Sequence, residues 1–239
     1  MSINIEKYHQ ISEELNGKAL LVAVSKTKPI EAIQALYDLG QRDFGENYVQ
    51  ELVEKHEQLP KDIRWHFIGH LQSNKVKYIA PFVHLIHGVD SENLLKEINK
   101  QAVKNNRVID LLLQVHIAQE ETKFGFSEEE LENVLMRKSR SIGTSYENVQ
   151  VKGLMGMASF SDDMNLVRRE FVYLKNLFEK VSAALSLPPS AMRTEHSALS
   201  IKPSAFSILS MGMSGDYKIA IEEGSTMVRI GSLIFGERG

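Results

Sequence analysis

The sequence predicts an α/β protein folded as a single (β/α)8 barrel of the TIM type, and three observations support this fold class. Short apolar, β-branched runs alternate along the chain with amphipathic runs of helical periodicity. The apolar runs are continuous, which is typical of parallel strands covered on both faces. Eight such repeats suggest a closed barrel with right-handed crossovers between parallel neighbours. A doubly wound open sheet is the alternative that the same pattern permits.

The eight expected strands are short runs rich in Val, Ile, Leu and Phe. They lie at residues 19–25, 42–45, 64–68, 83–89, 108–117, 149–154, 206–210 and 226–230. Each is followed by a polar or glycine-containing segment, as expected where a strand leaves a sheet.

The segments between the strands carry helix signals. Pro29 can occupy a first helical position, and Gly40 ends the amphipathic run that follows it. Ser127 and Glu130 form a capping box at the start of another helix. Residues 163–185 carry apolar side chains at helical spacing, which predicts a helix packed on the core.

Two segments lie outside this repeat. The first 17 residues read as a polar amphipathic helix and not as a signal peptide, and we expect this extra helix to cover the gap left after the last strand. Residues 186–207 are rich in Pro and Ser and are long for a connection within a domain. Nothing reads as an interdomain linker, so residues 1–239 are expected to form a single domain.

Composition excludes several classes of function. The chain has 239 residues, of which 43% are hydrophobic and 25% are charged. A net charge of −3 argues against a nucleic-acid or anionic-membrane binder, and no apolar run reaches membrane-spanning length. The absence of cysteine excludes disulfides and thiolate chemistry and fits a cytoplasmic location.

The carboxyl ends of the expected strands identify the residues to consider for function, because barrel enzymes place their active sites there. Lys26 follows the first strand directly. A desolvated lysine at this position could attack a carbonyl and form a Schiff base. An exposed lysine at a strand end is the alternative, since lysine is mostly exposed.

Two glycine- and serine-containing loops follow the seventh and eighth strands. Ser214 lies between two glycines in the first loop, and Gly231 and Ser232 form the second. Exposed backbone amides in such loops favour a phosphate, and the loops after strands seven and eight are the usual phosphate site of a barrel. The same residue types are also ordinary turn formers.

A lysine and a phosphate site in one pocket suggest pyridoxal 5′-phosphate, which carries an aldehyde and a phosphate. A sugar-phosphate aldolase remains the alternative. No metal site is expected, because His66 and His70 do not belong to a metal-binding motif and His66 lies within a strand. We interpret His66 as a structural or pocket-lining residue.

Several motifs, in order along the chain, resemble the pyridoxal phosphate homeostasis protein family: AVSKTKP, FGENYVQE, WHFIGHLQSNK, KGLMGMA and LSMGMSGDYKIAIEEGSTMVRIGSLIFG. The resemblance implies the fold of the alanine racemase N-terminal barrel domain. It implies that Lys26 forms the Schiff base with pyridoxal phosphate and that Arg229 faces the pyridine nitrogen. The remaining cofactor-binding residues that it implies are Ser210, Ser214, Gly231 and Ser232 for the phosphate, and Asn47, His66 and Lys123 along the pocket.

The resemblance also implies a role in vitamin B6 and amino-acid homeostasis without catalytic turnover. An amino-acid racemase is the alternative, although the second, β-rich domain of racemases, which supplies a tyrosine base, is missing from the pattern. The implied partners are pyridoxal phosphate and pyridoxal-phosphate-dependent apo-enzymes. No nucleic acid or membrane is expected as a partner, and the chain is expected to be a monomer.

Overall fold

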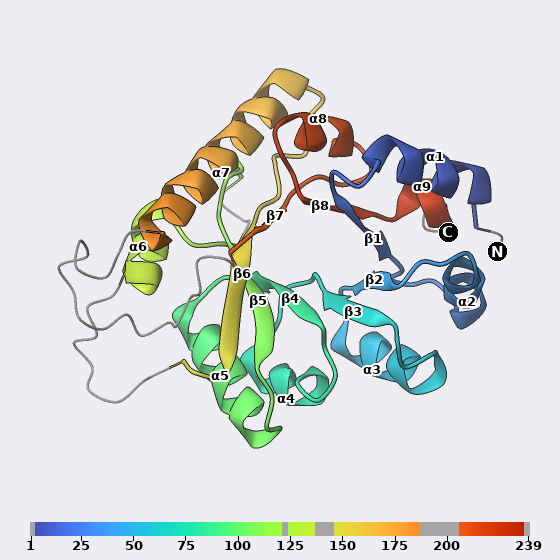
Figure 1. Cartoon of the computed structure of the whole chain (residues 1–239), viewed down its shortest axis with the longest axis horizontal. Helices are drawn as coiled ribbons and strands as arrows, with labels where there is room; N and C mark the ends of the chain where they lie inside the picture. Colours follow the sequence, from blue (N-terminus) through green and yellow to red (C-terminus); the bar gives the residue numbers. More distant parts are fainter. Residues whose placement is uncertain (1–2, 121–123, 137–145, 187–205, 237–239) are drawn as a thin grey trace.

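A closed barrel of eight parallel strands forms the centre of the molecule (Figure 1). The computed structural model describes residues 3–120, 124–136, 146–186 and 206–236. The strands are β1 Leu20–Val24, β2 Asp43–Glu46, β3 Arg64–Phe67, β4 Leu85–Val89, β5 Ile109–Gln114, β6 Val149–Met155, β7 Ile208–Ser210 and β8 Met227–Ile230. Each pairs with the next, and β1 pairs with both β2 and β8. The predicted barrel is therefore confirmed, and the open-sheet alternative is wrong.

Helices surround the barrel and alternate with its strands, as the sequence pattern predicts (Figure 1). Their bounds are α1 Ile5–Leu15, α2 Ile30–Asp38, α3 Val49–Gln58, the 3-10 turn η1 Ser73–Lys75, α4 Val76–Ile79, α5 Glu92–Lys104, α6 Glu128–Met136, α7 Met164–Leu185, α8 Tyr217–Glu222 and α9 Ser232–Phe235. No helix in the described part of the chain is long and apolar enough to cross a lipid bilayer.

The local helix signals hold with one small correction. Pro29 is the N-cap of α2 and not its first helical residue. Gly40 follows the end of this helix with φ +102°, a conformation that glycine adopts without strain. The capping box at α6 forms in both directions: Ser127 N donates to the Glu130 carboxylate, and Glu130 N donates to Ser127 Oγ. Most of the long 186–207 connection lies outside the described residues.

The N-terminal helix α1 packs beside α8 and α9, next to the place where β8 closes on β1 (Figure 1). Asn4 caps the helix by accepting a hydrogen bond from Lys7 N, and its own backbone N–H donates to Ile234 O at 2.8 Å. Tyr217 Oη donates to the Glu14 carboxylate at 2.6 Å. The extra helix predicted from the sequence is thus present and bonded to the last two helices.

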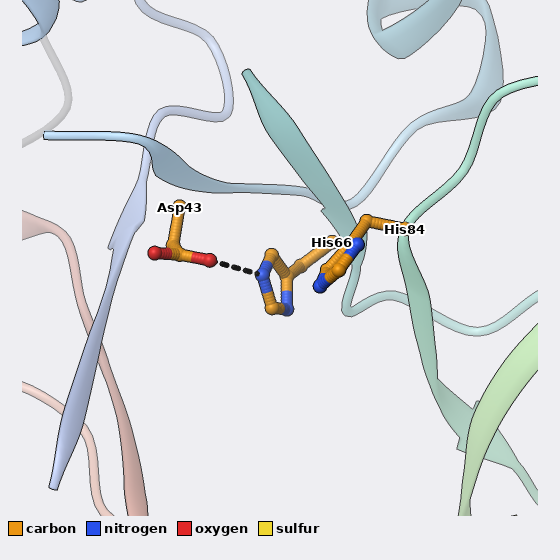
Figure 2. Close-up of side chains that lie close together, drawn as sticks. All are labelled: Asp43, His66 and His84. Atoms are coloured by element: carbon orange, nitrogen blue, oxygen red, sulfur yellow. Dashed lines mark hydrogen bonds and ion pairs between the residues drawn. The ribbon is translucent and has the colours of Figure 1, made fainter. Parts of the chain in front are cut away.

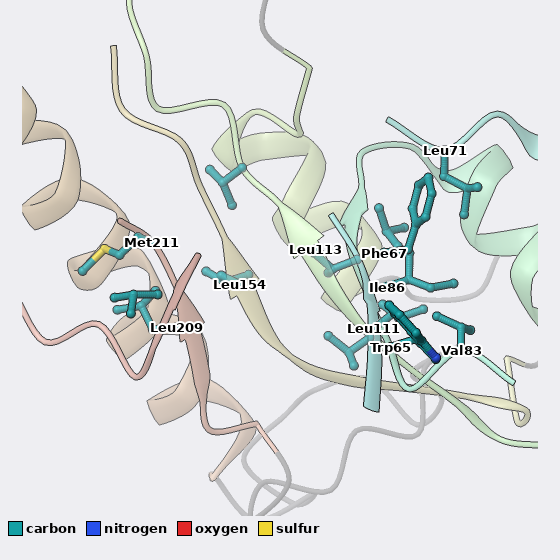
Figure 3. Close-up of a cluster of buried hydrophobic side chains, with 14 of the residues drawn as sticks. Trp65, Phe67, Leu71, Val83, Ile86, Leu111, Leu113, Leu154, Leu209 and Met211 are labelled. Carbon is teal, nitrogen blue, oxygen red and sulfur yellow. The ribbon is translucent and has the colours of Figure 1, made fainter. Parts of the chain in front are cut away.

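Two apolar clusters hold the barrel together. The large cluster fills the space between strands and helices and contains Trp65, which is 1% exposed and packs near Phe44 (Figure 3). The small cluster lies inside the barrel and consists of Val22, Leu85, Leu112, Met155 and Met227. The barrel interior is therefore only partly apolar, and buried polar side chains share the remaining space.

Candidate functional site

A pocket of about 510 Å³ opens at the carboxyl ends of β1 and β8. This volume is within the range usual for small-molecule sites. Its lining among the described residues is Val24, Lys26, Lys28, Ile68, Phe160, Met213, Ser214, Gly215, Asp216, Arg229, Gly231, Ser232 and Gly236. The pocket thus combines an apolar wall with three cationic side chains and a group of small residues.

Strand β1 carries Lys26 into this pocket through the period of two of a β-strand. Val22 faces the barrel interior and Val24 lines the pocket, so Lys26 continues the same face just beyond the strand. Thr27 follows with φ +62°, an uncommon conformation for a β-branched residue. Val22 and Val24 therefore face the inside of the barrel, whereas Leu21 and Ala23 pack in the large cluster between strands and helices.

A buried network fixes the backbone on both sides of Lys26. Before it, Ser25 Oγ donates to the Glu46 carboxylate at 2.6 Å, and Ser25 O accepts from Lys55 Nζ at 2.8 Å. After it, Thr27 N donates to the Glu51 carboxylate at 2.6 Å. Lys55 joins the two halves because its Nζ also donates to Glu46 at 2.8 Å and to Glu51 at 2.6 Å.

Glu46 is the most deeply buried carboxylate of this network. Its side chain is fully buried, and its Oε2 has no partner among the described residues. Burial raises the pKa of Glu46 to about 7, although the neighbouring Lys55 acts to lower it. The carboxyl group that anchors Ser25 therefore titrates near neutral pH.

Replacing Glu46 with glutamine should change how stability depends on pH. The folded-state pKa of about 7 lies above the ordinary 4.5, so the folded protein binds more protons between these values. The contribution of Glu46 to the free energy of unfolding is full below pH 4.5 and is lost as the pH rises through about 7. The pKa difference corresponds to roughly 3 kcal/mol.

Urea denaturation across pH 4.5–7.5 measures this effect. The slope attributable to Glu46 should be absent in Glu46→Gln and present in the control Glu57→Gln, which changes an exposed side chain of α3. Equal pH profiles of the wild type and Glu46→Gln would contradict the assignment.

Arg229 forms the floor of the pocket from β8. Its Nη1 donates to Ser210 O at 3.0 Å and to Ser210 Oγ at 2.6 Å, and its Nη2 donates to Gly156 O at 3.1 Å. Burial lowers the pKa of Arg229 to about 10, so the side chain stays cationic at neutral pH. A guanidinium has five N–H groups, and these bonds account for three of them.

Small residues form the part of the wall beside Arg229. Gly231 N donates to Ser214 Oγ at 3.3 Å, which joins the loops after β7 and β8. A Cβ at Gly231 would lie 3.1 Å from Val24 O and 3.2 Å from Val24 Cβ, so a larger residue would crowd β1. Ser232 begins α9 at the same edge. Backbone amides and hydroxyls gathered in this way suit an anion.

The structure brings five of the nine predicted site residues together on the pocket wall: Lys26, Ser214, Arg229, Gly231 and Ser232. Three lie elsewhere. Ser210 and His66 are fully buried below the pocket, and Asn47 follows β2 with a buried Oδ1 that has no partner among the described residues. Lys123 lies outside the described residues.

His66 belongs to a group at the opposite, amino-terminal face of the barrel. The side chains of Asp43, His66 and His84 offer ligand atoms within 4.8 Å of one another (Figure 2). Asp43, however, already accepts hydrogen bonds from Arg64 Nε at 2.8 Å and from His66 Nε2 at 3.0 Å. The Arg64 cation occupies the position beside the carboxylate and would oppose a metal ion there.

Sequence reasoning missed several residues that the structure brings into play. Lys28 lines the pocket, where its Nζ donates to Gly236 O at 3.0 Å. His87 is buried in the barrel and contacts both His66 and Ser210. A histidine in the apolar 83–89 run was the available signal for His87. For Lys55 and Glu46 no sequence signal stands out, because the contact depends on how α3 packs.

The architecture defines a class of protein: a closed barrel of eight parallel strands with a lysine just after its first strand and an arginine on its last. The family model of the alanine racemase N-terminal domain matches residues 4–239, and the chain belongs to this family. Alanine racemase from Bartonella henselae shares the fold with a TM-score of 0.67 at 16% identity, covering 97% of this chain and 59% of that one.

Within that class the chain belongs to the pyridoxal phosphate homeostasis protein family. It is 41% identical over 221 residues to the pyridoxal phosphate homeostasis protein of Aquifex aeolicus, covering 92% of this chain and 87% of that protein. It is 37% identical to the human protein of the same name, over 91% of this chain and 76% of that protein. The structure of PipY from Synechococcus elongatus with PLP bound superimposes with a TM-score of 0.80 at 31% identity, covering 97% and 99% of the two chains.

Proposed function

We propose that residues 1–239 form a single domain that binds pyridoxal 5′-phosphate and holds it covalently through its aldehyde on Lys26. One observation carries the proposal: the Lys26 amine, the Arg229 guanidinium and the small-residue wall of Ser214, Gly231 and Ser232 line one pocket. The relatives of this chain are named pyridoxal phosphate homeostasis proteins, which supports a role in vitamin B6 and amino-acid homeostasis.

The residues present fit this cofactor. Arg229 keeps two N–H groups beyond the three bonds described above, which suits a ring nitrogen that accepts a hydrogen bond. The absence of a side chain at Gly231 lets β1 and the loop after β8 lie close together, and the hydrogen bond from Gly231 N keeps Ser214 Oγ beside them on the pocket wall, where a phosphate could be held. When bound, the cofactor would supply an aldehyde for the lysine and an aromatic ring that can accept electrons.

The nature of the arginine favours holding the cofactor over turnover. Arg229 only donates hydrogen bonds and remains cationic, so it would leave the ring nitrogen unprotonated. An unprotonated ring withdraws electrons less strongly than one paired with a carboxylate. We therefore propose storage and delivery of the cofactor, with pyridoxal-phosphate-dependent apo-enzymes as recipients, and no catalytic cycle.

Borohydride trapping tests the proposal directly. The protein is incubated with pyridoxal phosphate or, in a parallel sample, with a sugar phosphate, then reduced with borohydride and digested for peptide mass analysis. We expect a stable adduct of the reduced cofactor on the peptide that contains Lys26. An adduct with the sugar phosphate alone would favour a Schiff-base aldolase, and no adduct would reject the proposal.

A second arm of the same experiment addresses the racemase alternative. The loaded protein is incubated with alanine or serine in deuterated water, and exchange of the α-hydrogen is followed by NMR. We expect no exchange beyond that of free pyridoxal phosphate, because racemisation needs a base on each face of the substrate. Enzyme-like exchange would revive the racemase. The same preparation should sediment as a monomer, and a dimer would contradict that part of the proposal.

A further inference from the structure

A chain of buried hydrogen bonds crosses the barrel interior below the pocket. From the pocket floor, Arg229 Nη1 lies 2.6 Å from Ser210 Oγ, which lies 3.1 Å from His87 Nδ1. His87 Nε2 lies 2.9 Å from His66 Nδ1, and His66 Nε2 lies 3.0 Å from Asp43 Oδ1. The five residues come from β8, β7, β4, β3 and β2, and all are buried. This chain of hydrogen bonds connects the pocket to the opposite, amino-terminal face of the barrel.

The two end residues, Arg229 and Asp43, determine which groups donate and which accept along this chain of hydrogen bonds. The guanidinium of Arg229 can only donate, so Ser210 Oγ accepts at that end. Hydrogen bonds from His66 and Arg64 outweigh burial and hold the pKa of Asp43 at about 2. The ionised carboxylate can only accept, so His66 Nε2 carries a proton at the other end.

The serine and the histidines then have one fully satisfied arrangement. Ser210 Oγ contacts only Arg229 and His87 among the described residues, so its proton must go to His87 Nδ1 to avoid an unsatisfied buried hydroxyl. Burial is the main cause that lowers the pKa of His87 well below its usual range, and nearby Arg229 acts in the same direction, so His87 is neutral. Its single proton lies on Nε2 and is donated to His66 Nδ1.

We propose that Asp43, His66 and His87 are positioning residues that act through Ser210 to orient Arg229 toward the pocket. The Asp43 carboxylate fixes the tautomer of His66, and the tautomer of His66 fixes that of His87. The unprotonated Nδ1 of His87 then accepts from the Ser210 hydroxyl, so this hydroxyl proton points away from Arg229. Nη1 is thereby held on an oxygen that can only accept from it, and the remaining N–H groups are left for a ligand. No proton is transferred along this network, because each side chain keeps the proton that it carries.

A metal ion bound by Asp43, His66 and His84 would be an alternative to this proposal, because it would use the same side-chain atoms. A cation bound there would need a lone pair of His66 on Nε2 or on Nδ1, whereas the hydrogen-bond network places a proton on Nε2 and uses Nδ1 to accept from His87. The two arrangements are therefore mutually exclusive and can be separated by locating one proton.

NMR of protein with ¹⁵N-labelled histidine locates that proton without any cofactor. We expect both His66 and His87 as neutral Nε2–H tautomers, each with an unprotonated Nδ1. In Asp43→Ala the acceptor is lost, and His87 should shift toward the Nδ1–H tautomer. The matched control is Asp62→Ala, which removes an exposed carboxylate bonded to Arg42 and leaves both tautomers unchanged. An Nδ1–H form of His87 in the wild type, or no change in Asp43→Ala, would overturn the proposal.

The effect at the pocket is measured separately and depends on the proposed function. Asp43→Ala should weaken pyridoxal phosphate binding by between about two- and thirtyfold, the usual range for coupling through a packed network, and should shift the visible absorption band. The isosteric Asp43→Asn serves if the alanine variant does not fold, with a smaller tautomer shift expected. Unchanged affinity and spectrum together with a shifted tautomer would overturn the link to Arg229. A wild type that binds no cofactor would reject the proposed function and leave the tautomer result standing.

Discussion

Replacing Lys26 with alanine should abolish the visible absorbance that the wild-type protein acquires when it is incubated with pyridoxal phosphate. The absorbance requires a nitrogen that attacks the aldehyde, and Lys26 is the lysine that β1 directs into the pocket along the face of Val22 and Val24. The rest of the pocket stays in place, so the cofactor can still bind through its phosphate and ring. We expect complete loss of the visible band and an affinity at least about tenfold weaker.

Lys28 provides the matched control for this experiment. It is a lysine two residues away that lines the same pocket, but its Nζ donates to Gly236 O and braces the chain after α9. Lys28→Ala should therefore keep the visible band, with at most a moderate loss of affinity. A variant pair with the opposite result, a coloured Lys26→Ala and a colourless Lys28→Ala, would assign the aldehyde to Lys28.

Replacing Gly153 with alanine should prevent the barrel from closing normally between β6 and β7. Gly153 has φ +155°, and an added Cβ would lie 1.8 Å from Ile208 O, the backbone of the strand with which it pairs. Neither strand can yield without breaking the ladder. We expect a loss of about 4 kcal/mol or more in the free energy of unfolding, which places this change among the largest single-residue effects.

Urea unfolding followed by tryptophan fluorescence measures this loss. The chain has one tryptophan, and Trp65 is buried in the large core, so its emission reports on the folded barrel. The control is Gly215→Ala, because no described residue other than its two chain neighbours has an atom within 4 Å of a Cβ built there. Its stability should change by less than about 1 kcal/mol. Similar unfolding curves for the two variants would show that β6 and β7 can rearrange.

The fold was predictable because its determinants are local in the sequence. Every strand that a continuous apolar run predicts is present, with bounds that differ by a few residues at most. The capping box at Ser127 and the glycine stop at Gly40 also act over one helical turn, and both appear as expected. The barrel follows from the number of repeats, since parallel strands with right-handed crossovers have few other ways to close.

The part of the site that lies at strand ends was predictable from the general geometry of barrels. Lys26, Arg229 and Gly231 lie at strand ends, and the barrel rule places all strand ends at one face. Ser210 and His66 also belong to strands, but their depth in the barrel depends on the stagger of neighbouring strands. That stagger places Ser210 against Arg229 and His87 rather than on the pocket wall.

The interior contacts could not be predicted from the sequence. His87 and His66 lie in neighbouring strands, and their contact depends on ring orientations that packing sets. Asp43 is the first residue of a short strand, where a turn residue would look the same. The link between Glu46 and Lys55 depends on a helix lying across the end of β2. Each contact needs the three-dimensional register, which a residue pattern does not contain.

The pairing of β1 with β8 has a consequence for the order of events during synthesis. Lys26 emerges from the ribosome with the first strand, whereas Arg229 and Gly231 belong to the last, and the two meet only when Val22 pairs with Arg229 and Ala23 with Ile230. A nascent chain therefore exposes Lys26 before the part of the pocket wall that follows β8 has been made. Any ligand that needs both strands can bind only after translation has passed β8, and it will then favour the closed barrel by mass action.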